Sequence, residues 1–186
     1  KNGIPTVVVA AFFQKDPQAM FAHPGQGYDT FKDMANAPVA FIGKDGQFSF
    51  WQWMKSDYGF KDKNLKPYTF NMGPFLADKK SIQQGYAFSE PITIKNAAGF
   101  EPVVHLLADN GFSTYGTTIE TRVDMVKTKP ETVRKFVEAS IIGWNNFLYG
   151  ENKAAKEMIL KINPDASFAV HQGYLDNIKK LGIVDS

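Results

Sequence analysis

The sequence predicts an α/β fold in which strands and helices alternate along the first part of the chain and helices alone follow. Short apolar runs bounded by glycine, proline and acidic residues alternate with segments of helical spacing as far as Arg122. Residues 129–182 then hold three amphipathic segments without a strand-like run. Such alternation is typical of an open three-layered α/β sheet, and two lobes joined by crossing strands fit it equally well.

Strands are predicted where apolar and β-branched residues run together between turn signals. The run GIPTVVVAAFF at residues 3–13 has the composition of a strand buried on both faces, as in parallel or mixed sheets. Further strands are expected, in chain order, at residues 19–24, 38–43, 65–71, 86–88, 101–109 and 113–122.

Helices are predicted from their spacing and from the residues at their ends. Pro74 and Pro91 suit the first turn of two helices, and Gly59, Gly85 and Gly99 are stop signals. The expected helices cover residues 27–37, with Asp29 or Thr30 as N-cap, and residues 48–59, 72–85, 89–99, 129–150, 151–162 and 166–182. The KDGQ segment before the second helix is expected to be a loop.

Composition excludes several classes of protein. The chain has 186 residues, 44% of them hydrophobic, which is enough for a sizeable core. Its 21 basic and 19 acidic residues are scattered, so nucleic acid is not an expected partner. No apolar stretch reaches the ~18 residues of a membrane span. The opening Lys1-Asn2-Gly3 has neither an initiator methionine nor a signal sequence, so we expect a mature or trimmed product.

The common catalytic and metal-binding motifs are missing. The absence of cysteine excludes disulfides, thiolate nucleophiles and cysteine metal sites. His23, His105 and His171 are far apart, and neither an HExxH nor a GxSxG motif occurs. The glycines at 25–27 and 43–46 lack the spacing of a phosphate loop. We therefore predict no metal, no cofactor and no reaction centre.

Polar and aromatic residues recur in the loops that follow predicted strands, where open α/β sheets bind ligands. Each of them alone is more often a cap, turn or core residue. The 16 Phe, 7 Tyr and 3 Trp residues serve core packing first and a stacking pocket second. Their recurrence predicts a cleft for a small molecule. The predicted ligand-binding residues are Phe13, Gln14, Gln47, Phe48, Ser49, Trp51, Asn71, Glu90 and Tyr115.

Several segments, in this order, resemble the NMT1/THI5-like group. They are the opening GIPTVVVAAFFQKDPQAMFAHP, then YDTFKDM, PVAFIG and FWQWMKSDYGF, and above all QQGYAFSEPITIKNAAGFEPVVHLLAD. This group comprises substrate-binding proteins of ABC importers, relatives of the aliphatic-sulfonate, nitrate and thiamine-pyrimidine binding proteins. The similarity extends through KPETVRKFVEASIIGWNNFL to the closing YLDNIKKLGIVDS.

The resemblance implies a type II periplasmic-binding-protein fold, with two three-layer α/β lobes, a hinge and a ligand in the cleft between the lobes. Residues 1–40 and 106–186 would form the first lobe and residues 41–105 the second. Members of the group begin with a further segment, so the first lobe is expected to be incomplete here. The resemblance also implies a periplasmic or other extracytoplasmic location, ABC permease subunits as partners, and room for a membrane tether through a segment before residue 1.

The group also includes enzymes that make the thiamine pyrimidine from pyridoxal phosphate and histidine, and this is the alternative function. Those enzymes carry a cysteine-rich motif that is absent here, and His23 lies in a turn-like HPGQG segment. A third alternative is an α/β interaction module that binds proteins through exposed aromatic residues.

Glu90 has two interpretations. In the structural one, Ser89 caps a helix and the carboxylate of Glu90 interacts with the helix dipole. In the functional one, which we favour, Glu90 accepts hydrogen bonds from a ligand N–H group, while Trp51 and Phe48 stack on a planar ligand. A carboxylate at this place disfavours an anionic ligand such as a sulfonate. A heterocycle or an amine-bearing metabolite is therefore the expected ligand.

Overall fold

A computed structural model of the chain describes residues 3–163 and 167–184, which form two compact units. The first unit consists of the described residues up to Asp16 and from Thr114 onward, and the second of Pro17–Ser113. Both mix helices and strands, so the predicted α/β class is confirmed.

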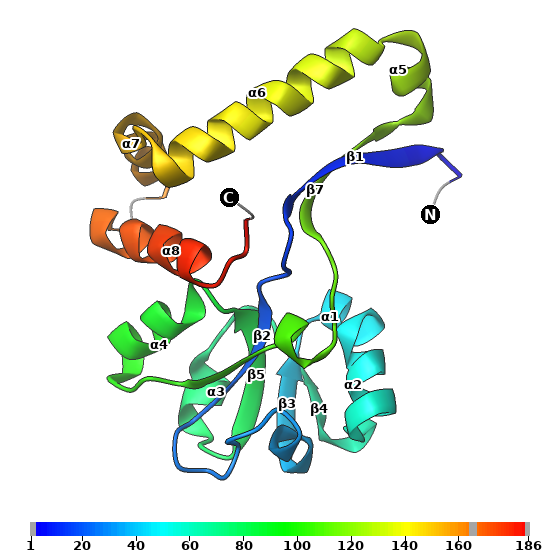
Figure 1. Ribbon diagram of the computed structural model, residues 1–186. Coiled ribbons are helices and arrows are strands. Elements are labelled where there is room, and N and C mark those ends of the chain that lie inside the picture. Colours follow the sequence, from blue (N-terminus) through cyan, green and yellow to red (C-terminus); the bar gives the residue numbers. More distant parts are fainter. Residues whose placement is uncertain (1–2, 164–166, 185–186) are drawn as a thin grey trace. The chain divides into compact units, whose positions relative to one another are not determined.

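The second unit is built on a five-stranded mixed sheet with the strand order β4-β3-β5-β2-β6 (Figure 1). Its strands are β2 (Gln18–Ala22), β3 (Val39–Ile42), β4 (Leu65–Pro67), β5 (Ser81–Tyr86) and β6 (Val103–Leu106). β3 runs parallel to β4 and β5, whereas β2 runs antiparallel to β5 and β6. β5 therefore lies in the middle of the sheet, with a partner on each side.

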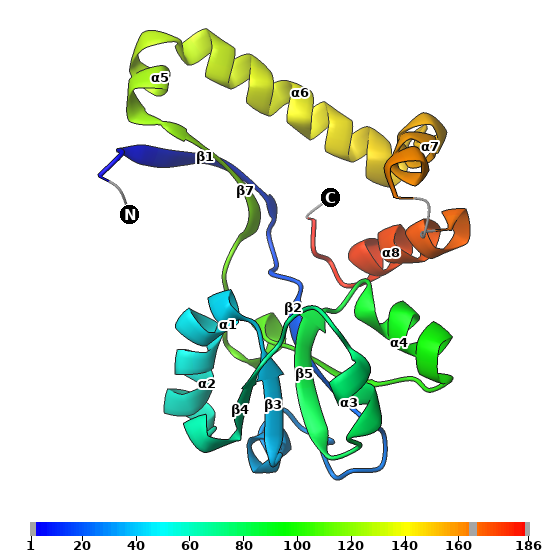
Figure 2. The ribbon, with the colours of Figure 1, turned by 180° about the vertical axis from the view of Figure 1, so that it is seen from behind.

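Helices cover both faces of this sheet, which gives the unit three layers (Figures 1 and 2). One face carries α1 (Lys44–Phe48) and α2 (Phe50–Tyr58), and the other carries α3 (Gly73–Ala77) and α4 (Glu90–Ala98). Short 3-10 turns are η1 (Asp33–Asn36), η2 (Asp62–Asn64) and η3 (Ala108–Asn110).

The core of the second unit lies between the sheet and α2. Met20, Ala40 and Ile82 of three different strands pack against Trp51 and Met54 of the helix, all of them nearly inaccessible to solvent. Burial of this apolar surface is the main force that holds α2 on the sheet. The loops and turns that begin at these strand ends are thereby held in place, and they form the site described below.

The first unit contains a two-stranded antiparallel ribbon and four helices. Its elements are β1 (Thr6–Phe13), β7 (Gly116–Arg122), α5 (Val123–Thr128), α6 (Pro130–Tyr149), α7 (Lys153–Ile162) and α8 (Phe168–Lys180). Phe12 stacks on Trp144 of α6 with ring centroids 5.8 Å apart, and Phe13 meets the same indole edge-on at 5.6 Å. The backbone N–H of Gln14 donates to the carbonyl of Ile183 at 2.8 Å, which ties the chain after α8 to the end of β1.

The prediction that residues 3–13 form a strand buried on both faces is wrong as to burial. The strand forms, but Val7 and Val8 are 38% and 55% exposed. Among the described residues β1 pairs with β7 alone, so the ribbon has no sheet around it to cover both faces. An apolar run predicts a strand, and its burial depends on what packs against it.

The boundaries of the two units differ from the expected lobes. Residues 17–40 and 106–113, expected in the first lobe, belong to the second unit. The reason is the pairing of β2, which joins β5 on one side and β6 on the other. Because strand pairing joins segments distant in sequence, neither composition nor turn signals mark this boundary.

Four local predictions are wrong. The helix expected at 27–37 is reduced to the η1 turn, where Thr30 N–H donates to Asp33 Oδ2 at 2.9 Å. The KDGQ segment, expected as a loop, forms α1. The helix expected at 72–85 ends at Ala77, and the strand expected at 86–88 lies earlier, as β5. Pairing with strands on both sides overrides the weak helical pattern of SIQQGY.

Other end signals are confirmed. Gly59 and Gly99 end α2 and α4 in the left-handed conformation, with φ of 76° and 75°, where a side chain would be strained. Pro91 lies in the first turn of α4. Ser167 caps α8 by accepting a hydrogen bond from Val170 N–H at 3.1 Å, while Ala166, the expected start of that helix, lies outside the described residues.

The long helix expected at 129–150 forms as α6, but its apolar side is largely uncovered. Phe136 and Ile142 are each 61% exposed, and Leu148 is its one fully buried residue. No helix within residues 3–163 and 167–184 has the length and apolar character of a membrane span.

Candidate functional site

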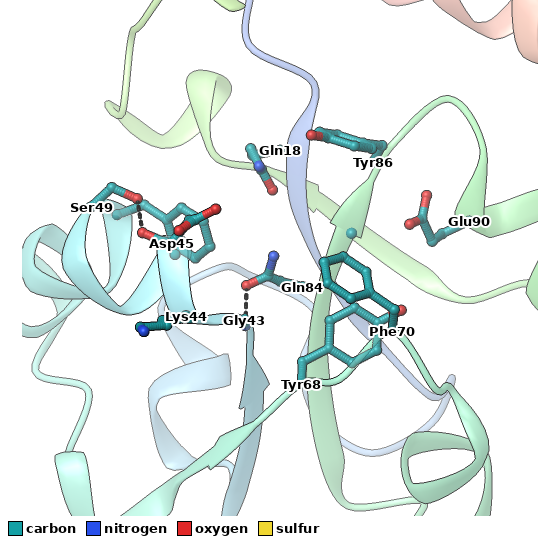
Figure 3. A pocket seen from close by; sticks show the side chains of 13 residues that line it. Gln18, Gly43, Lys44, Asp45, Ser49, Tyr68, Phe70, Gln84, Tyr86 and Glu90 are labelled. Atoms are coloured by element: carbon teal, nitrogen blue, oxygen red, sulfur yellow. Dashed lines mark hydrogen bonds between the residues drawn. The ribbon is translucent and has the colours of Figure 1, made fainter.

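A cavity of about 220 Å³ opens in the second unit at the ends of β3 and β5 (Figure 3). It is smaller than the pockets of about 300–1,000 Å³ that hold drug-sized ligands, so it suits a single ring system or one part of a larger molecule. The lining residues come from strands β2 and β5, from helices α1 and α2, from the loops before α1 and after β4, and from the start of α4. They are Gln18, Gly43, Lys44, Asp45, Gly46, Ser49, Phe50, Tyr68, Phe70, Gln84, Gly85, Tyr86 and Glu90.

One wall of the cavity carries a side-chain amide held by a backbone group. The backbone N–H of Gly43 donates to Oε1 of Gln84 at 2.6 Å (Figure 3). Gly43 directly follows β3, and Gln84 lies in β5, which pairs with β3. The pairing of the two strands therefore brings the amide to the start of α1.

Another wall is aromatic. Tyr68 and Phe70 follow β4, with ring centroids 5.4 Å apart, and Phe70 is 86% exposed with φ of 61°. A phenylalanine in the left-handed region is strained by roughly 1–2 kcal/mol. Tyr86, 44% exposed at the end of β5, stacks on Phe88 at 5.5 Å with the rings nearly parallel. These exposed rings offer flat apolar surfaces to a planar ligand.

Glu90 provides the acid of the site from the first position of α4. Ser89 occupies the N-cap position of α4, but its hydroxyl donates to the Glu90 carboxylate and makes no capping hydrogen bond to the helix backbone. Burial raises the pKa of Glu90, against the opposing effect of the Ser89 hydrogen bond. Burial also raises the pKa of Tyr68, with a smaller contribution from the charge of Glu90. The site thus favours a neutral carboxyl group more than water does.

Two of the predicted residues, Ser49 and Glu90, line this cavity, while Gln47 does not. The Ser49 hydroxyl donates to the Asp45 carbonyl at 2.8 Å. The Gln47 amide donates back to the Ile42 carbonyl at 2.9 Å and is used to fasten α1 to the end of β3.

The two predicted stacking residues do not line the cavity. Trp51 is 1% exposed, and its indole N–H donates to Asp62 Oδ1 at 2.8 Å, so it is a core residue. Phe48 is 76% exposed and outside the cavity. Phe48 is the last residue of α1, a helix in which Gly46 is the buried residue.

The other predicted residues lie elsewhere. Phe13, Gln14 and Tyr115 belong to the first unit, where Gln14 lines a separate cavity of about 190 Å³ beside Trp144. Asn71 accepts a hydrogen bond from Gly73 N–H at 2.9 Å and forms a turn at the start of α3. These residues were predicted because each follows a predicted strand. The loops after those strands belong to different units, so they do not share one cavity.

Sequence reasoning missed most of the polar and aromatic lining, namely Gln18, Tyr68, Phe70, Gln84 and Tyr86. Gln84 and Tyr86 are two residues apart in a strand, a spacing that places side chains on one face. That signal exists in QQGY but becomes readable only when the segment is known to be a strand.

Two of the histidines, His23 and His105, make structural contacts. His23 Nε2 lies 2.8 Å from the Phe75 carbonyl, and its ring stacks on Phe100 at 4.5 Å. His105 Nε2 lies 2.9 Å from the Tyr28 carbonyl. In the part of the chain that the structure describes, no three histidine or acidic residues gather as metal ligands.

Comparison with known proteins places these features in a family context. A family model described as NMT1/THI5 like matches residues 1–152. The chain is also similar to the riboflavin-binding protein RibY of Chloroflexus aurantiacus, with 27% identity over 171 residues. That alignment covers 89% of this chain and 48% of the relative, so the chain spans about half the length of RibY.

Proposed function

Because the chain belongs to the NMT1/THI5-like family, we propose that it is a solute-binding protein that holds a planar heterocycle in the cavity of the second unit. The observation that carries this proposal is the combination of exposed aromatic rings, an oriented amide and a buried acid around one small cavity. Rings bind the faces of a planar molecule, and the polar groups bind its edge. The role is binding without chemical change.

The chemistry of the cavity supports a neutral ligand over an anion. Glu90 and Asp45 line it together with one cation, Lys44, so a sulfonate or nitrate would lie among more acidic than basic groups in a partly desolvated place. A heterocycle with an N–H or amino group offers Glu90 a donor instead. The relative RibY binds riboflavin by name, and the flavin ring is such a heterocycle. A thiamine-pyrimidine precursor has the same character and is the second ligand to test.

The transport context is part of the proposal and rests on the family. Solute-binding proteins of this kind deliver ligands to ABC permease subunits on the outer side of the cytoplasmic membrane. We therefore propose an extracytoplasmic location and a permease as the partner, with closure around the ligand as the signal that the permease recognises.

A thermal-shift screen followed by calorimetry tests the ligand class. The compounds are riboflavin, 4-amino-5-hydroxymethyl-2-methylpyrimidine, taurine and nitrate. A ligand present at about 100 times its Kd stabilises the folded protein by about 2.7 kcal/mol, which is readily detected. A shift with either heterocycle and none with the anions is the expected result. A shift with taurine or nitrate alone contradicts the heterocycle assignment.

Substitution of Glu90 locates the binding at the cavity. Glu90→Gln should weaken binding of an amine-bearing heterocycle by roughly 1.5–3 kcal/mol, because the charged acceptor is lost. Glu101→Gln is the matched control, since Glu101 is exposed, pairs with Lys95 and lies outside the cavity. Equal affinities of the two variants would place the ligand elsewhere.

A further inference from the structure

The direction of the Gln84 amide is determined by its partner. An N–H group bonds only to an acceptor, so the atom 2.6 Å from Gly43 N is the amide oxygen and the other end is the NH2 group. Figure 3 shows this nitrogen pointing away from Gly43, into the space bordered by Gln18 and Asp45. Gln84 therefore presents its NH2 group, a hydrogen-bond donor, to the cavity.

The glycine at position 46 leaves the room that this arrangement requires. A Cβ atom at Gly46 would lie 2.6 Å from Gln84 Oε1 and 2.4 Å from a ring carbon of Phe50, closer than real Cβ atoms come. At Gly43 a Cβ atom would touch the Gln84 amide at 3.4 Å, an ordinary contact. The GKDG segment at residues 43–46, which has no phosphate-loop spacing, thus packs against the oxygen of the Gln84 amide. Close packing against Phe50 and Gln84 explains the glycine at position 46.

We propose, resting on the proposed function, that Gln84 is a specificity-determining donor that selects ligands with a ring carbonyl at this point over ligands with an amino group. A carbonyl oxygen accepts from the NH2 group directly. An amino group placed there would put two donors face to face, and burying them unpaired is costly. Gly43 acts through Gln84 and is a positioning residue.

Matched pairs of probes test the selection. One pair is pyrimidin-4-one and 4-aminopyrimidine, and the other is hypoxanthine and adenine. Within each pair, the first compound has an oxo group and a neighbouring ring N–H where the second has an amino group and an unprotonated ring nitrogen. Calorimetry on the wild-type chain should show the oxo member of each pair bound roughly tenfold to a hundredfold more tightly. In Gln84→Glu, one carboxylate oxygen still accepts from Gly43 and the other faces the ligand as an acceptor. The preference should therefore reverse in this variant.

A second variant keeps Gln84 and releases its orientation. Gly43 has φ of −67°, which suits proline, so Gly43→Pro removes the N–H group without forcing the backbone. The proline Cδ takes the place of the hydrogen and displaces the Gln84 oxygen, which lies 2.6 Å from Gly43 N. The amide thereby loses its fixed orientation, and the oxo preference should fall by roughly tenfold or more. Glu101→Gln, which lies outside the cavity, is the control, with the wild-type preference expected. Circular dichroism confirms that each variant is folded.

The possible results separate this inference from the function beneath it. Equal or reversed preference in the wild-type chain, no binding of either pair, or an unchanged preference in Gln84→Glu overturns the role of Gln84. If a heterocycle of the earlier screen still binds, the solute-binding function stands and only the specificity inference falls. If no heterocycle of either set binds, both fail.

Discussion

The side chain of Glu90 occupies the space that a Cβ atom at Gly85 would need. Such an atom would lie 2.8 Å from Cγ and Cδ of Glu90 and 2.8 Å from a ring carbon of Phe21, which is fully buried. Gly85 lies in the central strand β5, where a glycine normally weakens the sheet. Here it lets the first residue of α4 lie directly on the strand, at the edge of the cavity.

Gly85→Ala should therefore cost stability and displace the acid. The added methyl group has to push Glu90 and Phe21 aside, which should lower the free energy of unfolding by about 1–3 kcal/mol and weaken ligand binding. Urea denaturation and calorimetry measure the two effects. Gly143→Ala in α6 is the control, because a Cβ atom there meets nothing within 4 Å and should leave stability unchanged or higher. Equal stability of the two variants would contradict the close packing of Glu90 on β5.

The raised pKa of Glu90 predicts a pH dependence with a definite sign. Its folded-state pKa lies above the ordinary value of 4.5, because burial disfavours the charged form. The folded state then binds the proton more tightly than the unfolded state, so this contribution to stability is present below pH 4.5 and is lost as pH rises through the folded pKa. Glu90→Gln should gain stability relative to the wild type across this window. Urea denaturation from pH 4 to pH 8 measures it, and a difference between the two proteins that stays constant with pH would refute it.

Trp51 should matter for stability and not for binding. Trp51→Phe removes the indole bond to Asp62 and leaves space against Phe60, whose ring meets the indole edge-on at 5.7 Å. The expected loss is about 1–3 kcal/mol of unfolding free energy, with ligand affinity unchanged under folding conditions. Weaker ligand binding by the folded variant would contradict this prediction and show that Trp51 contributes to the ligand site.

Phe70 should behave in the opposite way. Phe70→Ala removes an 86% exposed ring from the cavity and should weaken binding of a planar ligand by about 0.5–1.5 kcal/mol with little effect on folding. Phe70→Gly removes the same ring and also relieves the strain at φ of 61°, so it should be more stable than Phe70→Ala. Both variants need the same calorimetric and urea measurements. Unchanged affinity in both would show that the ring does not contact the ligand.

Several features could be predicted because they depend on neighbours within a few residues. Gly59 and Gly99 end helices in the left-handed conformation, and Pro91 stands in a first helical turn, each for a local backbone reason. Glu90 was predicted from an acid placed where a helix begins, and the structure puts it beside the cavity. Apolar runs likewise located most strands, since a strand needs only a short alternating or continuous pattern.

The sequence by itself thus determined the α/β class, most helix ends and the position of one acidic residue. Tertiary structure alone decided that residues 81–86 form the central strand, that Trp51 is buried, and that Gly43 orients the amide of Gln84. The physical reason is distance along the chain. Helix ends depend on adjacent backbone groups, whereas burial and strand pairing depend on which remote segments meet. Gly43 and Gln84 are 41 residues apart and become neighbours only when β3 pairs with β5.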